Sequence, residues 1–232
     1  MNKDKTKYFL FFFLFLLVLS WIKSVWFISP ELHQGNVYRI MYLHVPSAMS
    51  AFFCSFLLLV FSVLRFVQKD NAKTRWYLWG LSSAEVGLFF TMLTLFTGSI
   101  WGKPTWGTWW TWDARLTTTF VLALLFCAYL LLASSLVPGF RQERVCSVLG
   151  ILIFVDVPII YKSVSWWRTL HQPPSMNFDG SPAIDGEILY HLLASIVCML
   201  FVSALLIWQR RNNLNLRVKV ESFSQTYLRS KF

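Results

Sequence analysis

Two histidines are the residues of this chain best placed to ligate a metal. His44 lies two positions before Pro46, a residue favoured in the first turn of a helix. His171 follows Trp167 by four positions, so the two would share one face if this stretch is helical. Two imidazoles can ligate a haem iron from opposite sides. We therefore interpret His44 and His171 as a candidate axial pair, although each taken singly also fits a structural or interfacial histidine.

A tryptophan-rich segment lies between these histidines in the sequence. Residues 101–113 contain five of the twelve tryptophans: Trp101, Trp106, Trp109, Trp110 and Trp112. Indole rings offer wide apolar faces at a low conformational cost, so such a cluster can stack on a large flat ligand. Tryptophan also collects at membrane interfaces, but a belt of that kind populates both interfaces. Most tryptophans here, including Trp166 and Trp167, fall toward one side of the predicted topology, which favours a stacking surface.

Charged residues flank the tryptophan segment. Asp113 directly precedes residues 114–116 and suits the N-cap of a following helix. Arg115 then lies in the first helical turn, where a cation is mildly unfavourable unless an anionic partner is present. Bidentate pairs with carboxylates favour Arg over Lys. Because Arg115 also adjoins the tryptophan segment, it is our first candidate partner for a haem propionate. The other cations on the same side are Arg39, Lys103 and Arg168.

The elements that must position these residues are membrane helices. Hydrophobic residues make up 56% of the 232 residues and charged residues 14%, against roughly 25% charged in soluble domains. A bilayer span needs about 20 apolar residues. Six stretches qualify: residues 8–28, 42–64, 76–98, 116–137, 145–162 and 187–208. Backbone groups in lipid must be satisfied internally, so we expect an all-α integral membrane protein with six transmembrane helices in a single domain, residues 1–232.

The orientation follows from the basic residues. With the N-terminus inside, 15 of the 21 Lys and Arg residues lie in inner segments, including a basic cytoplasmic tail at 209–232. The outer segments are then about 29–41, 99–115 and 163–186, and both termini face in. The net charge of +10 therefore reflects topology and contact with the lipid bilayer, and no nucleic-acid partner is expected. The basic, apolar N-terminus resembles a signal peptide but lacks a small-residue cleavage site, so we expect a retained anchor.

Other reactive residues rank lower. Cys54, Cys127, Cys146 and Cys198 all fall within predicted spans and form no CxxC pair, so we interpret them as packing residues. His33 and His191 are secondary ligand candidates. Glu85 and Asp156 lie in spans, where an ionisable side chain usually faces the protein interior. Asp156 precedes Pro158 by two residues, and we favour a role in satisfying freed backbone groups over a proton relay.

Three strings carry a family resemblance: His44-Val45-Pro46, residues 102–117 (GKPTWGTWWTWDARLT) and residues 166–172 (WWRTLHQ). Together they resemble the cytochrome c maturation protein C group of the tryptophan-rich WWD haem-handling family, over essentially the whole chain. The resemblance implies haem (haem b) held at the outer face, with His44 and His171 as axial ligands. The acidic residues Asp179, Asp185 and Glu187 depart from the usual pattern and bear on any partner contact there.

The resemblance also implies partners and a location. The haem would pass to a membrane-anchored haem chaperone of the cytochrome c maturation protein E type, assisted by ABC transporter subunits. The location would be the bacterial inner (cytoplasmic) membrane, with the mitochondrial inner membrane as the alternative, and no enzyme activity is expected. Two alternatives also bind haem: a membrane electron carrier like a b-type cytochrome, and a lyase that attaches haem to apocytochrome c. A channel or transporter has only the intramembrane carboxylates in its favour.

Overall fold

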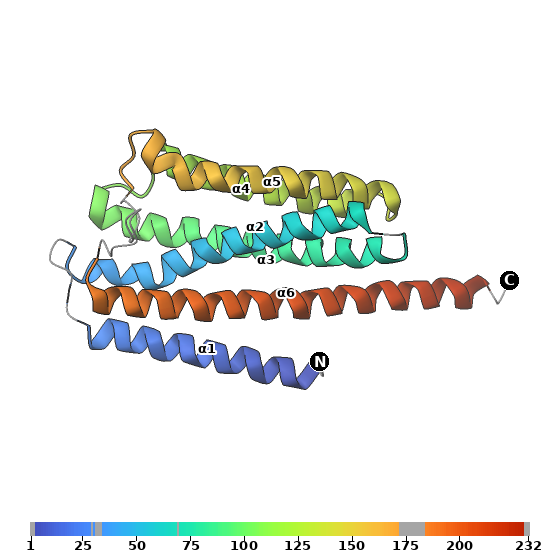
Figure 1. The fold of residues 1–232 in the computed structure, drawn as a ribbon, viewed down its shortest axis with the longest axis horizontal. Helices are drawn as coiled ribbons and strands as arrows, with labels where there is room; N and C mark the ends of the chain where they lie inside the picture. Colours follow the sequence, from blue (N-terminus) through green and yellow to red (C-terminus); the bar gives the residue numbers. More distant parts are fainter. Residues whose placement is uncertain (1–2, 29, 31–33, 69, 172–183, 230–232) are drawn as a thin grey trace.

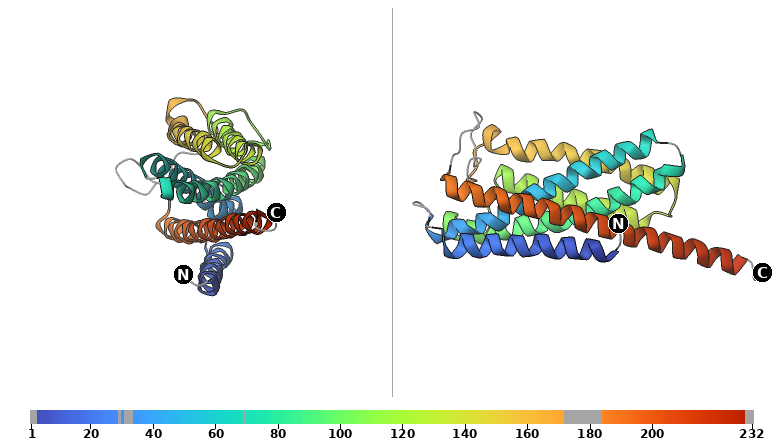
Figure 2. Two further views of the ribbon diagram at one scale, coloured as in Figure 1. Left: turned by 90° about the vertical axis from the view of Figure 1, so that its right-hand side faces the viewer. Right: turned by 60° about the horizontal axis from the view of Figure 1, so that its bottom comes forward.

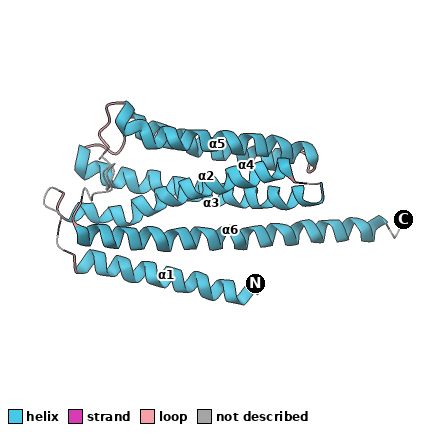
Figure 3. Ribbon diagram, viewed as in Figure 1, coloured by secondary structure: helices cyan, strands magenta, loops and turns pink. Residues whose placement is uncertain are grey.

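The computed structural model describes residues 3–28, 30, 34–68, 70–171 and 184–229. Within these ranges the chain is helical, with short connections and no sheet. The helices are α1 (Lys3–Trp26), the 3-10 helix η1 (Asn36–Ile40), α2 (Met41–Val67), α3 (Asp70–Trp106), α4 (Ala114–Ser135), α5 (Phe140–Trp166) and α6 (Gly186–Arg229). The predicted all-α membrane fold is therefore confirmed (Figure 3).

The helices form an elongated bundle (Figure 1). Five of them, α2 to α6, are long and apolar enough to cross a bilayer, whereas the apolar part of α1, Tyr8–Ser24, is shorter. Helix α2 packs against α3, α5 and α6, and α1 packs along α6 at the edge of the bundle (Figure 2). Successive helices run in opposite directions, so both ends of the chain lie at the same end of the bundle (Figure 1).

Small side chains let the central helices approach closely. The buried face of α2 includes Ser50, Ala51, Cys54 and Ser62. Small residues at helix contacts allow the close backbone approach that stabilises association in lipid. The tightest contact involves Gly150 of α5, where an added Cβ would clash with the Ser62 hydroxyl.

The burial of the four cysteines agrees with their predicted role as packing residues. All four carry free thiols: Cys54 and Cys146 are fully buried, and Cys127 and Cys198 are half-buried.

Polar groups inside the bundle bind within the protein. Many serine and threonine hydroxyls donate to the carbonyl four residues earlier in their own helix, as Ser55 does to Ala51 and Thr91 to Gly87. Because lipid offers no alternative partner, these bonds remove the cost of carrying a hydroxyl into the membrane.

Within the described part of the chain, two ion pairs connect helices away from the cavity. Glu85 of α3 pairs with the Arg210 guanidinium of α6, with an Nη2–Oε1 distance of 2.8 Å. The Nη2 atom of the buried Arg65 in α2 lies 3.6 Å from the Oε2 atom of Glu143 in α5. Glu85 therefore has a structural partner, in line with its predicted interior position. The buried Oδ2 atom of Asp156 has no hydrogen-bond partner among the described residues, so this atom does not satisfy the backbone groups beside Pro158.

The asymmetry of basic residues predicts which end of the bundle faces outward. Thr105, near the end of α3, and Ser222, near the end of α6, are both exposed. The ends of these two helices lie at opposite ends of the bundle (Figure 1). In a variant lacking the four native cysteines, we expect an impermeant maleimide added from the outer side to label Thr105→Cys but not Ser222→Cys. The reverse labelling pattern would invert the topology.

Candidate functional site

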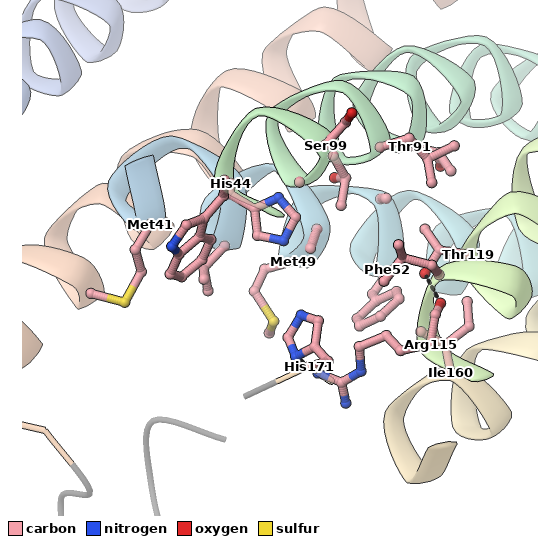
Figure 4. Close-up of a pocket in the computed structure, with 18 of the residues that line it drawn as sticks. Met41, His44, Met49, Phe52, Thr91, Ser99, Arg115, Thr119, Ile160 and His171 are labelled. Carbon is pink, nitrogen blue, oxygen red and sulfur yellow. Dashed lines mark hydrogen bonds between the residues drawn. The ribbon is translucent and has the colours of Figure 1, made fainter. Parts of the chain in front are cut away.

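A cavity of about 300 Å³ lies at the end of the bundle where α2, α4 and α6 begin and α3 and α5 end. It collects side chains from five helices: α2, α3, α4, α5 and α6. Ligand sites commonly occupy about 300 to 1,000 Å³ and combine apolar walls with a few polar groups. Here the polar groups include His44, Arg115 and His171, which surround the cavity in Figure 4.

The cavity brings the two candidate axial histidines together. His44 comes from the second turn of α2, and His171 comes from the segment that follows α5. Their ring centres lie 6.4 Å apart, with the ring planes at 35°. A metal–imidazole bond is about 2 Å long and the ring centre lies about 1 Å further, so two opposed ligands of one iron have ring centres roughly 6 Å apart. The observed spacing therefore fits one iron between the two rings.

His44 is held by helix α3. The ring is buried, and its Nδ1 atom lies 3.1 Å from the Thr97 hydroxyl oxygen. Trp101 approaches the His44 ring edge-on, with 5.6 Å between ring centres. The Trp101 indole N–H in turn donates to the Gln34 side chain at 2.8 Å. The imidazole is therefore fixed on one side by a hydrogen bond and on another by an anchored indole.

His171 and Arg115 lie together on the opposite side of the cavity. The guanidinium Nη1 of Arg115 lies 3.4 Å from the Nδ1 atom of His171, and Nη2 donates to the Tyr161 carbonyl at 3.1 Å. Since arginine can only donate, Nδ1 of His171 is the acceptor in this arrangement. Arg115 therefore connects α4, α5 and the segment that carries His171.

Asp113 joins the same elements. Its Oδ1 atom accepts the Leu116 backbone N–H at 2.8 Å, which confirms the predicted N-cap of α4. Its Oδ2 atom accepts the Thr169 hydroxyl at 2.7 Å, and that hydroxyl oxygen accepts the His171 backbone N–H at 3.0 Å. One carboxylate thus fixes the start of the helix that carries Arg115 and the segment that carries His171.

The tryptophans divide into two groups. Trp101, Trp106 and Trp110 line the cavity, and the ring centre of Trp106 lies 6.3 Å from that of His171. The other candidates do not line it: Trp109, Trp112, Trp166 and Trp167 are exposed. Trp112 is 74% exposed and meets Trp110 edge-to-face.

The other outer cations lie elsewhere. The Nη2 atom of Arg39 donates to the Ile28 carbonyl at 2.8 Å, and Lys103 donates to the Gly107 carbonyl at 3.0 Å. Arg168 is exposed, and none of these three lines the cavity. His191 is buried on α6 away from the cavity lining. His33 and Asp179 lie outside the described residues.

Three local details differ from the sequence-based expectations. Trp101 and Trp106 belong to helix α3 and not to a loop, because α3 continues through Pro104 to Trp106. Trp167 and His171 do not share a helix face, since α5 ends at Trp166. Pro46 lies inside α2, because that helix already begins at Met41.

Sequence reasoning also missed one wall of the cavity. Helix α6 contributes Leu189, Leu192, Leu193 and Ile196. Their i, i+3, i+4, i+7 spacing marks one face of a helix, but the same pattern occurs on helices that only face lipid. It therefore could not be assigned to a ligand site.

Two buried donors suggest what the cavity can bind. Nε of Arg115 and the indole nitrogen of Trp110 are buried without hydrogen-bond partners among the described residues, and both residues line the cavity. Unsatisfied buried donors cost free energy, and a ligand with acceptor groups would remove that cost. The residues present therefore fit an apolar, planar ligand that carries carboxylates and an iron between the two imidazoles.

The chain is similar to proteins of a known family. The family model described as heme exporter protein C matches residues 1–225. Heme exporter protein C from Haemophilus influenzae and that from Escherichia coli K12 are each 37% identical over 202 residues, 86% of this chain and 79% of each relative. A cytochrome c biosynthesis ccmC-like mitochondrial protein from Marchantia polymorpha is 36% identical over 170 residues, 72% of this chain and 69% of that protein. The chain belongs to the heme exporter protein C family.

Proposed function

We propose that this protein binds haem at its outer cavity and passes it on during cytochrome c maturation. His44 and His171 are the axial ligands, Trp101, Trp106 and Trp110 pack on the macrocycle, and Arg115 binds a propionate. The observation that carries the proposal is the 6.4 Å separation of the two imidazole centres across a cavity lined by indoles. Haem is the cargo here, and its reversible coordination by imidazole is compatible with later release.

The family to which the chain belongs supports a role in cytochrome c maturation. Relatives are named for heme export and for cytochrome c biosynthesis, in bacteria and in mitochondria. The role is that of a transporter component and not of an enzyme, in a membrane crossed by the apolar helices. We further propose that the haem is haem b, that the receiver is a membrane-anchored haem chaperone, and that ABC transporter subunits assist. The bacterial inner membrane is the corresponding location.

Loading the cavity requires a change at Arg115. While this side chain donates to Nδ1 of His171, the proton of a neutral His171 ring lies on Nε2, which then has no lone pair for iron. A haem propionate accepts a charge-assisted hydrogen bond from Arg115 and draws the guanidinium away from His171. Nδ1 of His171 can then take the proton, and Nε2 becomes a ligand. Recognition of the carboxylate and coordination of the iron are therefore coupled through one side chain.

The position of the site argues against an electron carrier of the b-type cytochrome kind. Such carriers hold haem between histidines deep within facing helices. Here one ligand lies near the outer end of α2 and the other outside the helices, in the segment after α5. This placement gives a partner access from the outer aqueous side.

The axial assignment predicts a spectral change. His44→Ala or His171→Ala should convert a six-coordinate low-spin haem into a five-coordinate or mixed-spin species, while much haem remains bound through the other imidazole and the indoles. The measurement is the absorption spectrum and the haem-to-protein ratio after identical purification. His191→Ala is the control and should leave both unchanged. An unaltered six-coordinate spectrum in both cavity variants would contradict the assignment.

The indoles that line the cavity should determine how much haem is bound more than how its iron is coordinated. Replacing Trp101, Trp106 and Trp110 together by Ala removes apolar contacts that contribute up to about 1.5–3 kcal/mol each when fully buried. Haem content should fall steeply, while the haem that remains keeps its six-coordinate spectrum. The matched control replaces the exposed Trp109, Trp112 and Trp166 by Ala and should retain haem. Equal loss from both triple variants would show that the cavity is not the stacking site.

Arg115 should be needed for propionate recognition. A hydrogen bond to a charged group contributes about 1.5–3 kcal/mol, so Arg115→Ala should weaken haem binding by roughly 10- to 100-fold. Arg168→Ala removes an equal charge from an exposed position and should bind like the wild type. The test is a haem titration of purified protein, repeated with haem dimethyl ester. If Arg115 binds a propionate, the ester should bind both proteins equally weakly; a remaining difference would refute this role.

A further inference from the structure

The contact between His44 and helix α3 determines which nitrogen of the ring carries the proton. The Thr97 hydroxyl has a single hydrogen, which it donates to the Leu93 carbonyl at 2.7 Å, with the Thr94 carbonyl at 3.2 Å. Both of these partners are carbonyl oxygens, so Thr97 Oγ1 can only accept from a third group. His44 Nδ1 lies 3.1 Å from that oxygen and is therefore the donor.

The protonation state of the other nitrogen follows. A neutral imidazole carries one proton, so a ring with its proton on Nδ1 has an unprotonated Nε2 with a free lone pair. Such a lone pair is what a metal requires, and ligating histidines usually donate from their second nitrogen to a protein oxygen. His44 meets this condition before any ligand arrives.

Gly98, the residue after Thr97, controls where the His44 ring lies. Gly98 leaves room for the imidazole, because a Cβ added there would lie 2.9 Å from Cε1 and 3.4 Å from Nδ1 of His44. The first distance is shorter than real contacts of a Cβ atom allow, so any side chain at position 98 would displace the ring. Thr97 and Gly98 are consecutive residues of one helix turn, and both face His44. The hydroxyl fixes the rotation of the ring, and the glycine fixes its distance from α3.

We propose that Thr97 and Gly98 are positioning residues that preset His44 as an iron ligand in the protein before haem binds. The inference rests on the proposed function only in identifying iron as the partner of Nε2. The proposal also distinguishes the two ligands. His44 has an unprotonated Nε2 before haem binds, whereas the His171 ring is held by Arg115. His44 should therefore be the first ligand to coordinate the iron.

The first experiment needs no haem. Nitrogen NMR of purified protein labelled with ¹⁵N-histidine distinguishes a protonated from an unprotonated ring nitrogen, and His44→Gln identifies the His44 signals. We expect a protonated Nδ1 and an unprotonated Nε2 in the wild type and in Thr97→Ser, which keeps the hydroxyl. Thr97→Val keeps the side-chain shape but removes the acceptor, so its spectrum should shift toward the other tautomer. A wild-type ring protonated on Nε2, or no difference between Thr97→Val and Thr97→Ser, would overturn the proposal.

The second experiment measures haem binding by the same proteins. Loss of a partner that orients a metal ligand typically weakens affinity by about 10- to 100-fold, which we expect for Thr97→Val, while Thr97→Ser stays near the wild type. Gly98→Ala should lower the six-coordinate fraction. The control is Gly80→Ala on the same helix, where an added Cβ meets neighbours only at 3.4 Å or more. Equal effects of the two glycine variants would refute the role of Gly98.

The two experiments separate the two hypotheses. The expected tautomer in a wild-type protein that binds no haem would support preset positioning and contradict the proposed function. Normal haem binding by both Thr97→Val and Gly98→Ala would support the proposed function and contradict the positioning role.

Discussion

Lipid offers no hydrogen-bonding partner, and this constraint determines how the polar residues of the bundle are arranged. Many intramembrane hydroxyls bind within their own helix, and Glu85 and Arg65 form ion pairs between helices. The Glu85–Arg210 pair fixes the register of α3 against α6. Thr97 follows Glu85 by twelve residues of continuous helix, or about 18 Å along α3. A register fixed by the ion pair is therefore transmitted along a rigid helix to the residues that hold His44.

At the end of the bundle that holds the cavity, several contacts converge on a single carboxylate. Asp113 caps α4 and also accepts from Thr169, so Arg115 and His171 are oriented by the two oxygens of one side chain. Removing it would release both groups together. A carboxylate at this helix start also balances the positive end of the helix dipole. Asp113 therefore acts through its neighbours and not through contact with the cavity, which it does not line.

The sequence allowed the architecture to be predicted because hydropathy and helix length are local properties. The helices and the N-cap at Asp113 follow from short windows of sequence, and the same windows made His44 and His171 candidate ligands. The cavity depends on contacts between residues far apart in the chain. Thr97 resembles other intramembrane threonines, and only the position of α2 beside α3 places its hydroxyl within hydrogen-bond distance of His44 Nδ1. Trp101 and Trp106 line the cavity for a similar reason, because α3 continues past Pro104 and carries both of them.

The arrangement of apolar and polar groups around the cavity agrees with the proposal that haem is held there only temporarily. The α2 and α6 walls are largely apolar. Near the start of α4 lie the donors of Arg115 and Trp110 that have no hydrogen-bond partner in the described part of the chain. An amphiphile with carboxylates would therefore turn its polar edge toward α4, where the N-terminal end of the helix also favours anions. None of the four cysteines lines the cavity, so no thiol of this chain is available there to form a covalent bond. Under the proposed function, the contacts that remain are coordination, stacking and ion pairing, and a receiving protein would exchange them one at a time.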